Sequence, residues 1–309
     1  MGGNQTPVTE FILLGFGNLP IQVSLFILFL TMYLITMTGN IIIIITLRMD
    51  SRLHTPMYFF LGNLSLLDMG YTSVTVPKLL SILLMEVHTI SFAGCFLQSY
   101  FFFFLGTAEC LLLAVMAYDR YVAICHPLRY LVIMSKQVCV LLVMGSWTGG
   151  CLTPLVAVIL VVRLPFCGPN VINHFFCDIP PLLKLACMDT YVVQKTVFML
   201  SAMVILTTFL STVVSYIYIG ITIMRIPSSQ GRSKAFSTCA SHLTVVSLYY
   251  GTVIFMYVSP TTRSSFNMNK IIAVVYSVVT PMLNPMIYSL RNQEMKIAMK
   301  REITSHTFS

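Results

Sequence analysis

The chain has 309 residues, of which 57% are hydrophobic and only 9% are charged, and its mean hydropathy is +0.86. A soluble domain carries about 25% charged residues, so this composition excludes a soluble globular protein and indicates one that crosses the membrane several times. The formal net charge of +8 would suit nucleic acid, but the charges lie in short clusters between apolar runs, as in loops beside a membrane, which argues against that partner.

Seven apolar stretches are long enough to cross a bilayer, which takes about 20 apolar residues in a helix. In chain order they cover residues 24–47, 57–80, 95–122, 138–161, 195–224, 235–258 and 270–290. We therefore predict an all-α membrane protein, a seven-transmembrane helix bundle that forms a single domain over residues 1–309. Residues 1–23 precede the bundle and residues 291–309 follow it as a tail.

The basic residues indicate which side of the membrane each loop faces. Twelve of the 18 Lys and Arg residues fall in one set of loops and in the tail, and six fall on the other side. Because cytoplasmic loops carry the excess of Lys and Arg, we predict a cytoplasmic tail and an extracellular N-terminus. A glycosylation sequon at Asn4 agrees with this orientation. The tail string "RNQEMKIAMKREI" predicts a short amphipathic helix on anionic membrane lipids.

Two carboxyl groups, Asp68 and Glu109, lie well inside the predicted bilayer. Ionisable groups there are costly and usually functional. One interpretation is a structural cluster in which one or both groups are protonated and hydrogen-bonded. The other is a sodium or proton site near Asn40 and Asn284 that collapses on activation.

Asp119 and Arg120 directly follow an apolar run, at the predicted cytoplasmic end of the third stretch. Such a pair can simply anchor a helix at the interface, with the long side chain extended into the polar layer. Together with Tyr121 it can also act as a switch. Arg120 would then bond Asp119 at rest and turn to a partner's backbone when the helices separate.

Four strings occur in the expected order on the predicted spans and carry a family resemblance. They are "PMYFFLGNLSLLD", "MAYDRYVAICHPLRY", "KAFSTCASHL" and "PMLNPMIYSLRN". Over nearly its whole length the chain resembles the rhodopsin-like G-protein-coupled receptors, and more closely their olfactory receptor branch. The stretch at 164–187 resembles the air-odorant class, class II.

The resemblance implies an odorant receptor and not an enzyme, with no catalytic residues and no cofactor. A small volatile ligand would bind in the outer half of the bundle, and an olfactory stimulatory G protein would raise cyclic AMP. The expected location is the plasma membrane of sensory neuron cilia, with membrane lipids and a trafficking helper as further partners. A seven-span transporter or channel is the alternative, but the inverted repeats and polar path that it requires are not visible.

The predicted ligand pocket uses the outer halves of the third, fifth and sixth spans, which are apolar and aromatic with few hydroxyl groups. Phe102 stands where amine receptors carry an aspartate, which favours a neutral ligand. Ordinary helix packing is the alternative role for each residue. The predicted ligand-binding residues are Phe102, Phe103, Gly106, Thr107, Val204, Val253, Ile254 and Tyr257.

The resemblance also implies an activation switch that joins the third span to the last three. Tyr250 replaces the usual tryptophan of the sixth span and would couple the ligand to that helix. His242 is either a latch toward Arg120 or a histidine satisfied at the interface. The predicted set is Asp119, Arg120, Tyr121, Tyr216, His242, Tyr250, Asn284, Pro285 and Tyr288.

Four cysteines lie on the predicted extracellular side, and the residues alone allow three disulfide pairings or free thiols. The resemblance implies Cys95–Cys177 and Cys167–Cys187, which would fold the long loop at about residues 162–194 into a lid. No metal-ligand spacing is visible in the sequence. The one metal that the resemblance suggests is a sodium ion at Asp68 and Glu109.

Overall fold

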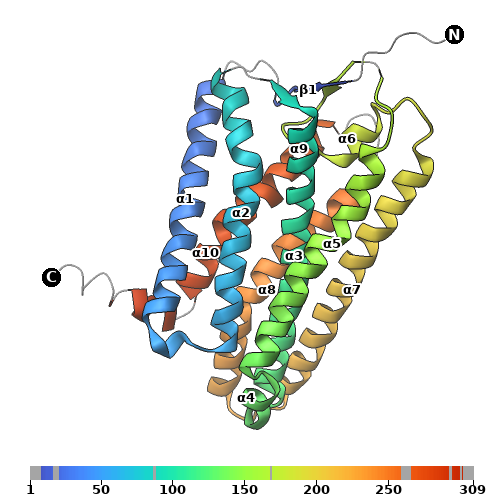
Figure 1. Ribbon diagram of the computed structural model, residues 1–309. Coiled ribbons are helices and arrows are strands. Elements are labelled where there is room, and N and C mark those ends of the chain that lie inside the picture. Colours follow the sequence, from blue (N-terminus) through green and yellow to red (C-terminus); the bar gives the residue numbers. More distant parts are fainter. Residues whose placement is uncertain are drawn as a thin grey trace.

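The computed structural model describes residues 8–16, 21–85, 88–167, 169–258, 266–291, 294–299 and 301. Long helices run antiparallel, side by side, and a small β-sheet covers one end of them (Figure 1). We call this end the sheet end. The opposite end, where the short helix α4 (Tyr130–Ile133) lies, is the α4 end.

Six long helices and one interrupted helix form the bundle. The continuous ones are α1 (Gln22–Met49), α2 (Pro56–Met85), α3 (Phe92–Cys125), α5 (Lys136–Val162), α7 (Tyr191–Met224) and α8 (Ser229–Val258). The interrupted one consists of α9 (Phe266–Val274), the π-helical turn η3 (Val275–Val279) and α10 (Thr280–Arg291). Short helices are η1 (Ser51–Leu53), η2 (Pro127–Arg129), α6 (Ile179–Leu183) and residues 294–299.

Each predicted span lies within one of these helices, but the helices run further than the apolar stretches do. For α3 and α5 the reason is that a capping residue, not the edge of the hydrocarbon, sets where the helix begins. The Ser91 hydroxyl accepts a hydrogen bond from the Gly94 N–H at 3.1 Å, and α3 therefore begins at Phe92. Ser135 caps α5 through the Val138 N–H in the same way.

Five stretches of the described chain are both long and apolar enough to cross a membrane. They are Gln22–Met49, Phe92–Cys125, Lys136–Val162, Tyr191–Met224 and Asn269–Tyr288. Helix α8 adds the shorter apolar stretch Cys239–Ile254. Helix α2 is more polar, but its polar groups Ser65, Asp68 and Thr72 are buried among the other helices. A helix with its polar side chains turned inward can still face lipid with the remaining surface.

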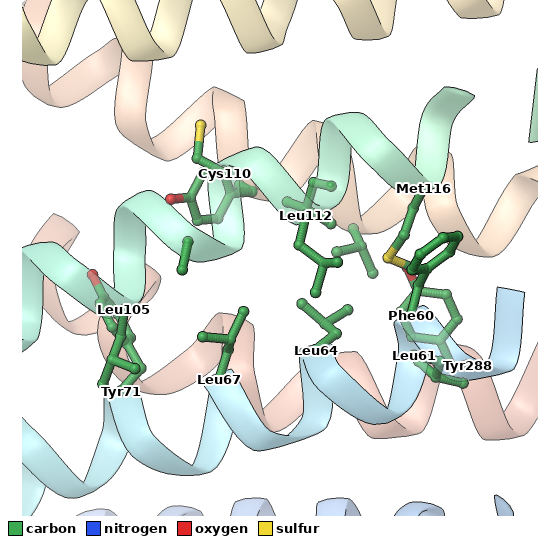
Figure 2. Close-up of a cluster of buried hydrophobic side chains, with 14 of the residues drawn as sticks. Phe60, Leu61, Leu64, Leu67, Tyr71, Leu105, Cys110, Leu112, Met116 and Tyr288 are labelled. Carbon is green, nitrogen blue, oxygen red and sulfur yellow. The ribbon is translucent and has the colours of Figure 1, made fainter. Parts of the chain in front are cut away.

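Contacts between α2 and α3 form one part of the core. Figure 2 shows Leu64 and Leu67 of α2 pointing toward the side chains of Leu112 and Met116 on α3. All four side chains are almost completely buried. Lipid tails are as apolar as leucine, so burial alone does not drive these helices together. Close packing and interhelical hydrogen bonds must supply the stabilisation instead.

The sheet at the sheet end joins three segments that are far apart in sequence. Its strands are β1 (Glu10–Leu13), β2 (Thr89–Ser91) and β3 (Val171–Ile172), in the order β2-β1-β3. β1 is antiparallel to β2 and parallel to β3. Phe11 and Leu13 face inward and are fully buried, and the Lys270 Nζ donates a hydrogen bond to the Gly15 carbonyl at 2.6 Å. The segment before α1 is thereby fixed across the bundle end.

Both disulfide bonds implied by the resemblance are present, Cys95–Cys177 and Cys167–Cys187. Cys95 lies in the first turn of α3, so the first bond ties the segment between α5 and α7 to that helix. The second bond closes a loop within the same segment. We call residues 164–187, which include β3 and α6, the lid segment.

Helices α3 and α5 approach each other closely at Gly150. A Cβ atom added at Gly150 of α5 would lie 2.6 Å from the Cβ of Ala108 on α3 and 2.9 Å from the Ala108 backbone nitrogen. Real Cβ atoms essentially never come so close to backbone. Only glycine fits at this point, so position 150 sets the spacing of the two helices.

We predict that Gly150→Ala destabilises the protein by about 1–3 kcal/mol, because the added methyl group must push α5 away from α3. The measurement is the thermal unfolding midpoint of the purified protein in detergent. Gly145→Ala is the matched control on the same helix, since no atom lies within 4 Å of a Cβ there. Equal midpoints for the two variants would contradict the packing argument.

Candidate ligand cavity and switch

A cavity of about 220 Å³ lies toward the sheet end, beneath the lid segment. Helices α3, α5 and α7 supply most of its wall, and α2, α8 and η3 supply single residues or pairs. Its lining residues are Tyr71, Phe102, Phe103, Gly106, Thr107, Cys110, Thr153, Pro154, Ala157, Asp178, Ile179, Pro180, Val197, Leu200, Ser201, Val204, Ile205, Tyr249, Val253 and Tyr276. The wall is mostly apolar and aromatic.

Six of the residues predicted to bind ligand lie in this wall: Phe102, Phe103, Gly106, Thr107, Val204 and Val253. Ile254 is not among the lining residues and packs against the core cluster instead. The side chain of Tyr257 lies outside the described residues. The structure therefore gathers six of the eight positions around one space, and their role as ligand contacts stays a prediction.

An aromatic cluster closes one side of the cavity. The Phe102 ring centroid lies 4.8 Å from that of Tyr71, 4.4 Å from that of Phe176 and 5.8 Å from that of Tyr276. Offset and tilted ring pairs at these distances are favourable beyond their buried area. Four separate segments thus meet at Phe102, and the sequence pattern had pointed only to Phe102 itself.

A tyrosine that was not among the predicted residues contacts the cavity. Tyr249 lines it and donates a hydrogen bond to the Gly106 carbonyl at 2.7 Å. Tyr250 lies outside the lining, packs on Phe209 and accepts a weak bond from the Cys110 thiol at 3.7 Å. Adjacent helix residues point about 100° apart, and the string "SLYYGT" does not reveal the rotation of α8.

Asp178, which was not among the predicted residues, is the one carboxyl group among the described residues of the wall. It is 7% exposed and precedes α6, where its Oδ1 accepts a hydrogen bond from the Ile179 N–H at 2.9 Å. Burial raises the pKa of Asp178 to about 7. Its position directly after Cys177, in the segment expected to act as a lid, was the available signal.

Two other lid residues, His174 and Cys177, are set by burial and by a bond to a helix. Burial, with a smaller effect from Lys270, lowers the pKa of His174 to about 3, so its imidazole is neutral. Gln98 of α3 accepts a hydrogen bond from the Cys177 N–H at 3.0 Å and donates one to the Val74 carbonyl of α2 at 2.9 Å. The lid segment is therefore hydrogen-bonded to α3, whose Gln98 is in turn bonded to α2, and it is also held by disulfides.

At the α4 end, Asp119 is fully buried and has both oxygens engaged. Arg120 Nη2 lies 2.8 Å from Asp119 Oδ2, and the Tyr130 hydroxyl donates to Asp119 Oδ1 at 2.8 Å. Burial, followed by the negative charge of Asp119, raises the pKa of Tyr130, which keeps this hydroxyl a donor. Tyr130 was missing from the predicted set, although it ends the string that carries the pair. Tyr121 turns elsewhere and bonds His126 at 3.2 Å.

His242 of α8 is fully buried and its Nδ1 lies 2.6 Å from the Tyr216 hydroxyl of α7. The two rings stack with centroids 5.8 Å apart. The predicted latch toward Arg120 is not a hydrogen bond within the described part of the chain. His242 instead joins α8 to α7, and its Nε2 has no hydrogen-bond partner there.

Asp68 and Asn284 meet in the middle of the bundle. The Asn284 amide donates to both Asp68 oxygens, at 3.0 and 3.1 Å. The described residues provide no hydrogen-bond partner for Asn40 Oδ1, Asn284 Oδ1 or Glu109 Oε1. These unpartnered oxygens fit a sodium ion or a shared proton chemically, because all three are acceptors. Within the described residues no three His, Cys, Asp or Glu side chains form a metal-binding group.

The remaining predicted switch residues lie beside that cluster on α10. The Tyr288 hydroxyl is buried and has no hydrogen-bond partner among the described residues. Pro285 lies against α1, where a Cβ at Gly39 would come within 3.1 Å of its Cγ. Proline in a membrane helix removes a backbone donor, and the π-helical turn η3 just before α10 loosens the same helix. The last span is thus irregular both at η3 and at Pro285.

The chain as a whole is similar in sequence to known proteins of one family. A profile of the olfactory receptor family matches residues 29–306. Human olfactory receptor 6N1 is 51% identical over 302 residues, which is 97% of each chain. Mouse olfactory receptor 5G9 is 52% identical over 301 residues, 97% of this chain and 96% of that one. Human olfactory receptor 6J1 is 55% identical over 293 residues, 94% and 84% of the two chains.

These matches cover the predicted spans, the Asp119–Arg120 pair and the lid segment alike, and they confirm the resemblance carried by the four strings. The chain belongs to the olfactory receptor family and is a non-enzymatic, multi-pass G-protein-coupled receptor with a seven-transmembrane bundle.

Proposed function

We propose that this receptor binds small, mostly apolar volatile molecules in the cavity beneath the lid segment and then activates an olfactory stimulatory G protein, which raises cyclic AMP. The observation that carries the proposal is the cavity itself, aromatic and aliphatic with a few hydroxyl groups. Its volume of about 220 Å³ is below the roughly 300–1,000 Å³ of pockets for drug-sized ligands. A volatile odorant is a ligand of the right size and polarity.

The proposed orientation puts the sheet end outside the cell and the α4 end in the cytoplasm. Basic residues support it, since twelve of 18 lie in the loops and tail on the α4 side. Asn4 would then be accessible to glycosylation, although it lies outside the described residues. Residues 1–23, 24–290 and 291–309 keep their proposed roles as outer segment, bundle and tail, in the plasma membrane of sensory cilia.

The α4 end has the features of a resting state. Arg120 would have to reach a G protein, yet its side chain is bonded to Asp119 and is only 10% exposed. Asp119 is in turn held by Tyr130 of α4. A ligand shifts such an equilibrium only by binding the active state more tightly. A shift from 1% to 99% active takes about a 10⁴-fold difference in affinity, so a weakly bound volatile is expected to be a partial agonist.

We also propose that Asp68 and Glu109 share a sodium ion or a proton that is lost on activation. Asn284, which bonds Asp68, has an oxygen without a hydrogen-bond partner among the described residues, as do Asn40 and Glu109. The two carboxyl groups interact electrostatically. An ion or proton bound there would satisfy these atoms in the resting state. Its removal would allow α10 to repack at Pro285 and Tyr288.

The proposed function is tested by measuring cyclic AMP in cells that express this chain with an olfactory-type G protein, across a panel of small volatiles. Arg120→Ala is expected to abolish every response, because the G protein loses its contact at the end of α3. Arg129→Ala, an exposed arginine at the same end, is the matched control. Silence across the panel, with surface expression verified, would refute odorant sensing. Responses that survive Arg120→Ala would refute the switch.

We predict that Val204→Phe lowers odorant potency roughly tenfold, because the larger side chain occupies part of the cavity. Its neighbour Met203 faces away from the bundle and is 62% exposed, so Met203→Phe should leave potency unchanged. Dose–response curves for both variants, normalised to surface expression, give the comparison. A similar loss in both would mean that the cavity is not the odorant site.

Tyr130→Phe is expected to raise signalling without ligand up to about tenfold. The variant removes the hydroxyl that donates to the Asp119 carboxylate, so Asp119 holds Arg120 less firmly. Tyr118→Phe, at an exposed position on the same end of α3, serves as control. Basal nucleotide exchange on the G protein is the readout. An unchanged basal rate in Tyr130→Phe would show that this bond does not restrain the receptor.

A further inference from the structure

The lid segment contributes one carboxyl group, that of Asp178, to a cavity that is otherwise mostly apolar. Asp178 is the only acidic side chain among the lining residues. It is 7% exposed, and within the described residues it takes part in no ion pair. A buried carboxyl group without a cation is costly unless hydrogen bonds satisfy it. Its hydrogen bonds therefore decide what else it can bind.

The sequence around Asp178 leaves one of its oxygens without a backbone donor. An aspartate that caps a helix normally accepts hydrogen bonds from the second or third N–H of that helix. In α6 those two positions are Pro180 and Pro181, and proline has no N–H. Only the Ile179 N–H remains, and it donates to Oδ1 at 2.9 Å. The described residues provide no hydrogen-bond donor for Oδ2.

Two other polar side chains in the wall are already bonded to their own or neighbouring helices. The Thr153 hydroxyl donates to the Gly149 carbonyl at 2.8 Å, and the Tyr249 hydroxyl donates to the Gly106 carbonyl at 2.7 Å. Neither is then free to donate toward Asp178. A molecule in the cavity that carries its own donor would meet the open oxygen of a buried acceptor, where the bond is stronger than in water.

We propose that Asp178 selects odorants whose head group donates a hydrogen bond, that is alcohols and amines, over acceptor-only relatives of the same carbon skeleton. The selection is a property of the lid segment, which the Cys95–Cys177 bond fixes directly beside the site. With a pKa of about 7, both forms of the acid are present at neutral pH. A hydroxyl group can bond either form, whereas an ether or aldehyde can bond only the protonated one.

This inference rests on the proposed odorant function and deepens it. The experiment compares cyclic AMP responses to matched sets of straight-chain probes, from pentanol to nonanol with the corresponding aldehydes, methyl ethers and amines. In the unmodified receptor, alcohols or amines should be at least about tenfold more potent than the aldehyde and ether of the same skeleton.

Asp178→Asn gives the sharpest variant, because the Ile179 N–H fixes which side of the amide is the oxygen. The side-chain oxygen keeps the helix cap, and the NH₂ group takes the place of Oδ2. The ammonium group of an amine has no acceptor and should lose about ten- to hundredfold in potency. Aldehydes and ethers should gain and approach the alcohols, whose hydroxyl can accept from the NH₂ group as well as donate. Asp178→Ser, which keeps a cap acceptor and removes the second oxygen, should reduce alcohol responses without the gain for aldehydes.

The matched control is Asp189→Asn. Asp189 also accepts a backbone hydrogen bond, from the Tyr191 N–H at 2.9 Å, but it is exposed and does not line the cavity. This variant should keep the order of potencies of the unmodified receptor. Because that order tests the proposal by itself, the outcome does not depend on whether the Asp178 variants reach the cell surface.

The outcomes separate the two proposals. Silence of all volatiles at verified surface expression would refute the odorant function, and the inference with it. If volatiles act but aldehydes and ethers equal alcohols, or if Asp178→Asn leaves the order unchanged, the inference is wrong and the odorant receptor stands.

Discussion

The central position of α3 is the constraint on which the rest of this structure depends. The helix contacts α2, α5, α7 and α8, and it is pinned against α5 where Gly150 meets Ala108. Its 34 residues span about 50 Å, and they carry Phe102 in the cavity wall and Arg120 at the α4 end. One rigid helix therefore joins the proposed ligand site to the proposed G-protein site. Because α3 is wedged on several sides, it cannot itself be the part that moves far.

Helix α8 is the better candidate for movement. It shares much less contact with α3 than α5 and α7 do. Hydrogen bonds at separate levels hold it, through Tyr249 to Gly106 of α3 and through His242 to Tyr216 of α7. The nearby Asp68–Asn284 cluster is only partly satisfied, and a partly satisfied buried network has more than one arrangement of similar energy. Polar bonds that can be exchanged thus lie beside a helix that packs only lightly on α3.

Much of the fold was predictable because lipid imposes a simple rule on sequence. Every predicted span lies in a helix, and α3 and α5 begin before their apolar stretches because Ser91 and Ser135 cap them, which hydropathy does not register. β1 was not predictable, because its partners lie about 80 and 160 residues away and a four-residue strand has no pattern of its own. Tyr249 and Tyr130 were missed for a related reason. Which of two adjacent tyrosines faces a cavity, and which loop residue folds back onto Asp119, depends on helix rotation and loop path.

The lid segment and α8 both line the cavity, but only α8 is proposed to move, so their residues have different roles. Asp178 follows Cys177, which is bonded covalently to α3, so a ligand bond to Asp178 would be nearly the same in the resting and active states. Such a bond raises affinity but cannot shift the equilibrium. Val253 and Tyr249 belong to α8, and contacts to them change when that helix moves. Under the proposed mechanism the head group of an odorant would therefore set how tightly it binds, and the shape of its apolar body against α8 would set how strongly it activates.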